Sequence, residues 1–312
     1  MKRLVIFLIA LSLAGCHELR RAPTSASGKP ARMSAFEGAF DNHAQVWQAH
    51  EAAPGAVPPP HVTVGIEATD QTDWTLWRVR LDANPPLETL WAMHGVAQSD
   101  GTRALVPHRP LVATPAAAPK FDVQQWAALD ACTLRTGAGG SSGAPMSADA
   151  AACAAIAPGI GAEVALLPIG VERDSEWLHL RLYSDQARGT DAREDLRAVR
   201  WFGGWAAVNG GGPKADAASR DWHMDRNVRI GSEGGRYSLR WRDGGASGYS
   251  LVLERLNYRE GNVPVLKLSV VSDADGGALA YAWANPEATR IGINLGWVQV
   301  GLEREDVAAP AK

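Results

Sequence analysis

Apolar and polar residues alternate along most of the chain from residue 61 onward, as in β-strands that bury one face. In the first half this pattern predicts strands at 62–68, 74–81, 87–96, 104–114, 131–135, 162–171 and 177–184. In the second half it predicts strands at 196–208, 227–231, 236–242, 249–257, 263–273, 279–284 and 290–302. Glu-Gly-Gly and Asp-Gly-Gly sequences between several of these supply the positive φ angles of tight hairpins. Many short strands of this spacing predict a mainly β protein, either an antiparallel barrel or a sandwich.

Helical spacing occurs in only a few places. Phe36, Phe40 and Trp47 recur at helical intervals, and Ser34 followed by Glu37 is a capping-box pattern, so we expect a helix over 34–53. Two further short helices are expected at 121–129 and at 147–155, the second with Ser147 as its N-cap.

The N-terminus carries an apolar run that is too short to span a bilayer. Lys2 and Arg3 precede residues 4–13, which are apolar except for Ser12, and the small residues Ala14 and Gly15 lead into Cys16. A membrane helix needs about 20 apolar residues, whereas a run of about ten suits a secretory signal peptide with a small-residue cleavage site. The run Leu-Ala-Gly-Cys resembles the bacterial lipobox, which implies cleavage before Cys16 and lipidation of that cysteine. An ordinary signal peptide with a chance cysteine is the alternative.

Lipidation would make the membrane a partner of this protein. Each buried CH₂ of an acyl chain contributes about 0.8 kcal/mol, and two or more chains hold a protein firmly. In the sorting scheme that the lipobox implies, an aspartate after the cysteine retains a lipoprotein at the inner membrane. His17 stands there instead, so the expected location is the periplasmic face of the outer membrane.

The predicted elements divide the chain into five parts. These are a signal peptide at 1–15, a flexible tether at 16–33, a β-barrel domain at 34–184, a C-terminal β-rich region at 195–303 and a frayed tail at 304–312. The boundary at 185–194 rests on a polar, turn-like composition. One continuous large sheet is the alternative arrangement.

Charge and cysteine content narrow the class of protein. A net charge of −3 over 312 residues argues against a nucleic-acid partner, since such proteins are usually basic. Once Cys16 is lipidated, Cys132 and Cys153 remain, and two thiols in an oxidising compartment are expected to pair. A disulfide closing this loop contributes about 3 kcal/mol by chain entropy. Reduced free thiols are the alternative.

Several features between residues 34 and 184 resemble the CpcT/CpeT family, whose cyanobacterial members are chromophore lyases for phycobiliproteins. The features are the segment 36–45, the Trp-containing strand at 74–81, the segment 105–111 with His108 where the family has tyrosine and with Arg109 retained, the cysteine pair, and the Gly-Ala strand at 161–167. The chain departs from the family in the 74–81 strand, which reads Leu-Trp-Arg-Val-Arg, and nothing after residue 184 matches. The resemblance implies a calycin-like barrel that accommodates an elongated ligand such as a tetrapyrrole.

Each of two predicted strands carries aliphatic side chains on one face and aromatic and basic side chains on the other. In the strand at 177–184, Leu178, Leu180 and Leu182 share one face. Either the leucines form the core and the charged side chains face water, or the aromatic-basic faces line the inside of a barrel and bind an anionic amphipathic ligand. The second alternative, together with the resemblance for Arg109, gives the candidate ligand-binding residues Trp74, Arg78, Arg80, Arg109, Trp177, His179 and Arg181.

Motifs for catalysis are weak. Asp221, His223 and Asp225 fall on one face of an extended segment, but a solvated turn is the simpler interpretation. We therefore expect no catalytic residues, no metal and no cofactor. The first hypothesis is a non-enzymatic, outer-membrane-anchored lipoprotein that binds a hydrophobic or amphipathic small molecule. Alternatives are a tetrapyrrole (bilin) lyase-like or chaperone-like activity, and a structural or assembly lipoprotein acting through the strands of Trp201, Trp205 and Trp297; protein partners are unknown.

Overall fold

The structure is a computed structural model that describes residues 33–98, 102–112, 120–137, 144–189, 192–216, 218–257 and 263–305. The expected signal peptide, Cys16, almost all of the tether and most of the C-terminal tail lie outside the described residues. Residues 32–312 form one compact unit. No helix among the described residues is both long and apolar enough to cross a membrane.

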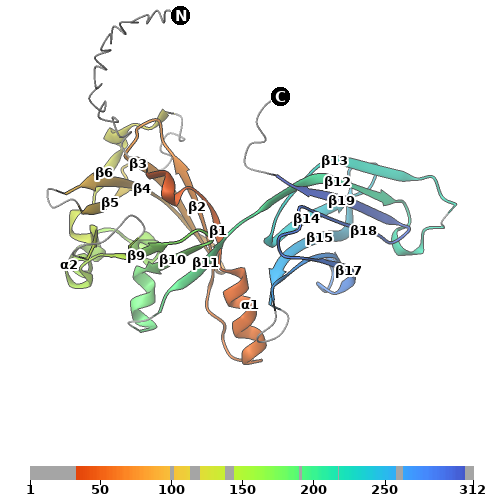
Figure 1. The fold of residues 1–312 in the computed structure, drawn as a ribbon, viewed down its shortest axis with the longest axis horizontal. Helices are drawn as coiled ribbons and strands as arrows, with labels where there is room; N and C mark the ends of the chain where they lie inside the picture. The colour runs from red at the N-terminus through yellow and green to blue at the C-terminus, as the bar shows by residue number, and fades with distance from the viewer. Residues whose placement is uncertain are drawn as a thin grey trace, which may run out of the picture. The chain divides into compact units, whose positions relative to one another are not determined.

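The first part of the described chain is a closed antiparallel β-barrel (Figure 1). Within the described residues, ten strands follow the order β4-β3-β2-β1-β11-β10-β9-β8-β7-β5, and β5 pairs back with β4. The short β6 (Trp126–Ala128) also pairs with β5. The barrel strands are β1 (Gly38–Asp41), β2 (His61–Ala68), β3 (Trp74–Asp82), β4 (Leu87–Ala97), β5 (Arg103–Pro110), β7 (Leu134–Thr136), β8 (Met146–Ser147), β9 (Pro168–Arg173), β10 (Trp177–Leu182) and β11 (Glu194–Ala198).

Aliphatic and tryptophan side chains pack inside this barrel. The leucines of β10 and the face of β3 that carries Trp77 and Val79 belong to one buried core. Trp77 and Trp91 are fully buried, and the indole N–H of Trp91 donates to the Leu166 carbonyl at 2.9 Å. A buried indole needs such an acceptor. The aliphatic faces of β3 and β10 therefore form the core, and their aromatic-basic faces lie on the outside.

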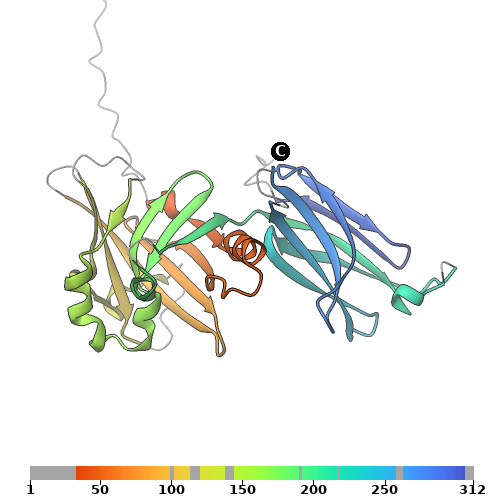
Figure 2. The same ribbon diagram turned by 90° about the horizontal axis from the view of Figure 1, so that it is seen from below.

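The second part of the described chain is a sandwich of two four-stranded antiparallel sheets (Figure 2). One sheet has the order β13-β12-β19-β18 and the other β14-β15-β16-β17. Aliphatic residues from both sheets share one core, among them Val298 of β19 and Leu251 of β15. The strands are β12 (Trp201–Asn209), β13 (Trp222–Gly231), β14 (Glu233–Arg240), β15 (Ala246–Leu256), β16 (Val265–Ser272), β17 (Ala278–Ala284), β18 (Arg290–Asn294) and β19 (Val298–Arg304). The predicted fold class, a mainly β chain with an antiparallel barrel and a C-terminal antiparallel β-region, is confirmed.

Several predicted helices are shorter than expected or absent. The helix predicted over 34–53 is wrong in its first half, because Phe40 enters the barrel core on β1 and α1 (His43–Ala52) begins only afterwards. The segment 121–129 forms a 3₁₀ turn, η3 (Val123–Gln125), followed by β6 rather than a helix. The last predicted helix, α2 (Ala150–Ile156), is capped by Asp149 rather than Ser147. Other short 3₁₀ helices are η1 (Met33–Phe36), η4 (Asp130–Cys132), η5 (Ala157–Gly159), η6 (Ala162–Leu166), η7 (Tyr183–Ala187) and η8 (Gly212–Lys214).

The barrel extends past its predicted end at residue 184. β11 lies between β1 and β10, so the barrel is closed only when residues 194–198 are included. Glu194, Leu196 and Ala198 face inward from this strand, and its last residues fall in the strand predicted at 196–208, which is instead two strands, β11 and β12. The sandwich begins with β12 at Trp201.

Cys132 and Cys153 form a disulfide across 21 residues of sequence. Both cysteines are fully buried, Cys132 at the end of η4 and Cys153 within α2. The predicted pairing is confirmed. The bond links two short elements beside the barrel that have few hydrogen bonds of their own.

Candidate functional site

The outer face of β10 carries three of the predicted ligand-binding residues in a row. Trp177, His179 and Arg181 alternate with the buried Leu178 and Leu180, because successive side chains of a strand point to opposite sides. The rings of Trp177 and His179 lie nearly parallel, 6.4 Å apart. This row is the part of the predicted site that the fold keeps together.

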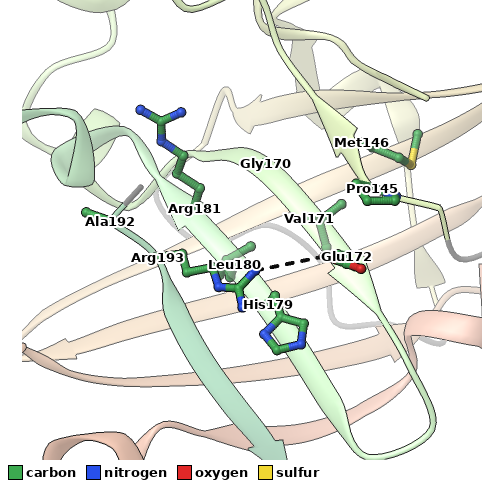
Figure 3. A pocket seen from close by; sticks show the side chains of 10 residues that line it. All are labelled: Pro145, Met146, Gly170, Val171, Glu172, His179, Leu180, Arg181, Ala192 and Arg193. Carbon is green, nitrogen blue, oxygen red and sulfur yellow. Dashed lines mark ion pairs between the residues drawn. The ribbon is translucent and has the colours of Figure 1, made fainter. Parts of the chain in front are cut away.

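Part of the row lines a hollow of about 510 Å³ on the outside of the barrel (Figure 3). We call it the barrel hollow. Its lining comes from the end of the loop before β8 and from β8, β9, β10 and the segment leading into β11. The lining residues are Pro145, Met146, Gly170, Val171, Glu172, His179, Leu180, Arg181, Ala192 and Arg193. A smaller hollow of about 240 Å³ adjoins it through His179 and is also lined by Gln45, Gln48, Trp177 and Asp195.

Gly170 provides the space for Arg181. A Cβ at Gly170 would lie 3.2 Å from Cβ of Arg181, which is its partner in the β9–β10 register. The Arg181 side chain therefore crosses the bare backbone of β9. Any larger residue at position 170 would push it away from this part of the wall.

Ion pairs fix the other charged groups of the barrel hollow. The Asp195 carboxylate contacts Nδ1 of His179 at 2.5 Å and Nε of Arg193 at 2.9 Å. Arg193 also reaches Glu172 at 4.0 Å, the ion pair drawn in Figure 3. Glu172 stands opposite His179 in the register. Glu172, Asp195 and Arg193 thus each have a partner of opposite charge.

Arg181 has no such match among the described residues. Its Nε is buried without a hydrogen-bond partner, and in Figure 3 its guanidinium points away from the Arg193–Glu172 pair. An unsatisfied buried donor of a charged group costs about 1–3 kcal/mol or more. The barrel hollow therefore holds one guanidinium without an ion-pair partner among the described residues, which a carboxylate or phosphate of suitable shape would complement.

The predicted residues of β3 do not join this site. β3 is separated from β10 around the barrel by β2, β1 and β11. Arg78 and Arg80 are exposed and pair with Glu88 at 2.7 Å and Asp82 at 3.0 Å. Arg109, on β5 opposite Ala127, is half-buried and also lies apart from β10.

Trp74 instead belongs to a separate aromatic cluster on the outside of β3–β5. Its ring stacks on His94 at 4.3 Å and contacts His108 at 4.6 Å and Phe121 at 5.0 Å. Burial lowers the pKa of both histidines, which favours their neutral form beside the indole. Trp126 belongs to the same buried cluster, so these side chains pack against one another on the barrel wall.

The three tryptophans proposed for a C-terminal interface do not share a surface. Trp297 is buried in the sandwich core against Tyr249. Trp201 is half-buried beneath the Arg229 guanidinium at 3.9 Å, whereas Trp205 is exposed. A single patch made of all three is therefore excluded.

Sequence reasoning missed Arg193, Asp195, Glu172 and Gly170 as parts of the site. Arg193 lies in the segment 185–194, whose polar composition predicted a domain boundary, and Asp195 directly precedes the strand predicted at 196–208. The alternation of Asp195 with Leu196 is the only local signal of β11, and it is short. Within the described residues, no group of three or more His, Cys, Asp or Glu side chains is arranged to hold a metal ion.

Comparison with known proteins gives no relative for this chain. No family model, no curated protein and no solved structure matches it. The class of protein therefore rests on the fold alone: a closed antiparallel barrel, compatible with a calycin-like ligand-binding protein, followed by a β-sandwich.

Proposed function

We propose that this protein is a non-enzymatic lipoprotein, anchored through Cys16 at the periplasmic face of the outer membrane, whose barrel binds an anionic amphipathic small molecule. The binding site is the barrel hollow on the outer face of β8–β11. The lipobox-like N-terminus supports the anchor, and the unmatched Arg181 supports the ligand class.

The observation that carries the proposal is the position of Arg181 at the edge of a partly apolar hollow. Pro145 and Ala192 give the walls accessible apolar groups, since Met146, Val171 and Leu180 are buried in the barrel core, so part of a ligand can leave water there. A carboxylate or phosphate on the same ligand would accept from the guanidinium, and such charge-assisted bonds are among the stronger ones. A volume of about 510 Å³ falls within the range of small-molecule sites, roughly 300–1,000 Å³.

Laurate and dodecanol distinguish the anionic group from the apolar chain. Both are titrated by tryptophan fluorescence into the Cys16→Ser protein, so that its own acyl chains do not compete. We expect laurate to bind more tightly than dodecanol, and Arg181→Gln to weaken laurate binding by about tenfold or more, the loss of one charged hydrogen bond. Dodecanol binding should change little.

Arg78→Gln is the matched control, because it removes an arginine from the same barrel at an exposed, ion-paired position. It should leave laurate binding unchanged. Equal losses in the two variants, or equal affinities for laurate and dodecanol in the parent protein, would refute the proposed site.

A further inference from the structure

A second hollow lies at one end of the C-terminal sandwich, remote in sequence from the barrel hollow. We call it the sandwich hollow; it has a volume of about 520 Å³. Three separate segments form it: the end of β12 with the turn after it, the residue that precedes β13, and the hairpin between β14 and β15. The lining residues are Val208, Gly210, Gly211, Asp221, Trp241, Arg242 and Asp243.

Trp241 is the aromatic wall of the sandwich hollow. Its ring is half-buried and packs against the sandwich core. A Cβ at Gly212 would lie 3.5 Å from the tip of this ring, so the glycine turn approaches it closely. Backbone hydrogen bonds between Trp241 and both Gly244 and Gly245, each of 2.9 Å, close the hairpin on which it stands. The ring is therefore held in place before any ligand arrives.

Arg242 and Asp221 form the polar side of the sandwich hollow. Nε of Arg242 lies 3.1 Å from Oδ1 of Asp221, and another guanidinium nitrogen donates to the Trp222 carbonyl at 3.0 Å. The carboxylate itself sits over Gly210, where a Cβ would be only 2.1 Å from its Oδ2. A larger residue at position 210 would force the Asp221 side chain out of this place.

Asp243 adds a further acceptor at the rim. Its Oδ1 accepts the backbone N–H of Gly245 at 2.9 Å, which fixes the side chain within the hairpin turn. The sandwich hollow thus presents hydrogen-bond donors from Arg242 and acceptors from two carboxylates beside a fixed aromatic ring. The three charges sum to one negative, which disfavours an anionic ligand.

We infer that the sandwich hollow binds a neutral saccharide. A pyranose ring has an apolar C–H face that packs on an indole and a rim of hydroxyls that both donate and accept hydrogen bonds. The ion pair of Arg242 and Asp221 places hydrogen-bond donors and acceptors side by side in the sandwich hollow. The site is independent of the barrel hollow, so either can fail without the other.

The test uses the full-length protein in a detergent without sugar groups. Triacetylchitotriose and maltotriose are the neutral probes, trigalacturonate is the anionic comparison, and binding is measured by isothermal titration calorimetry and saturation-transfer NMR. We expect at least one neutral trisaccharide to bind and trigalacturonate to bind at least tenfold more weakly.

Substitutions in the sandwich hollow then test whether the saccharide binds there. Trp241→Ala should lower the affinity by about tenfold or more, whereas Trp241→Phe, which keeps an aromatic face, should retain most of it. Trp205→Ala is the control, because Trp205 is exposed on the same sandwich but does not line the sandwich hollow. Arg242→Lys, at an exposed position, tests the polar side even if Trp241→Ala misfolds, and it should also weaken binding.

No binding of either neutral trisaccharide would overturn the inference. So would unchanged affinity in both Arg242→Lys and Trp241→Ala, a loss of affinity in Trp205→Ala equal to that in Trp241→Ala, or trigalacturonate binding as tightly as the neutral probes.

Discussion

At the scale of single residues, His61 at the start of β2 is partly buried between two carboxylates. Its Nε2 lies 2.7 Å from Asp41 and its Nδ1 2.7 Å from Asp82. Hydrogen bonding to Asp41, opposed by burial and assisted by Asp82, raises the pKa of His61 to about 9. The imidazolium therefore joins β1, β2 and the end of β3 at one rim of the barrel.

This arrangement predicts a pH-dependent contribution to stability. Because the folded pKa of about 9 exceeds the unfolded value of about 6.5, the contribution is complete below about pH 6.5 and is lost as the pH rises through about 9. We expect His61→Gln to lower the free energy of unfolding by about 2–3 kcal/mol at pH 6 and by much less at pH 9.5.

Urea unfolding at the two pH values measures this difference. His50→Gln, at an exposed position on α1, is the control and should cost little at either pH. A cost of His61→Gln that is the same at both pH values would show that the ion pairs do not form.

At the scale of elements, buried charges join β11 of the barrel to β14 and β15 of the sandwich. Glu233 of β14 is fully buried and accepts from Nε of Arg255 at 2.6 Å and from Nε of Arg197 at 2.9 Å. Arg255 also donates to Glu176 at 2.8 Å and to the Ala198 carbonyl at 2.8 Å. These contacts cross from the β9–β10 hairpin and β11 to β14 and β15.

Removing one member of this cluster leaves a buried charge without its partner. We expect Arg255→Ala to lower the free energy of unfolding by about 3–5 kcal/mol. Arg236→Ala, on β14 but exposed and paired only with Asp273, should cost less than about 1 kcal/mol. Chemical denaturation followed by far-UV circular dichroism measures both, and similar costs for the two would mean that the cluster is not buried as described.

The comparison of sequence and structure is clearest at this scale. Alternation located β2, β3, β10 and most of the sandwich strands, because each buries one face, but it joined β11 to β12 and β18 to β19 in single predicted strands. Alternation could not show which face of a strand lies inside the barrel, because side chains on both faces repeat every two residues. The closed barrel shows it, since Leu178 and Trp77 lie within its core. β11 and the pairing of Asp195 with His179 depend on contacts between distant segments, which no local pattern contains. The row Trp177, His179 and Arg181 was predictable, and Gly170 beneath it was not.

At the scale of the whole molecule, the proposed anchor at Cys16 would hold the barrel and the sandwich beside a membrane. We expect Cys16→Ser to abolish metabolic labelling with palmitate and to release the protein from outer-membrane fractions on a sucrose gradient, since the acyl chains supply the membrane affinity. Cys132→Ser, which removes a disulfide cysteine instead, should remain labelled. Palmitate labelling of Cys16→Ser would contradict the anchor.

The central claim is that the barrel hollow holds an anionic amphipathic molecule through Arg181. Native mass spectrometry of the protein purified from its own envelope tests it most directly. We predict a bound small molecule with a carboxylate or phosphate group, present in the parent protein and in Arg78→Gln and absent from Arg181→Gln. A bound molecule retained in equal amount by Arg181→Gln, or none in the parent protein, would contradict the account.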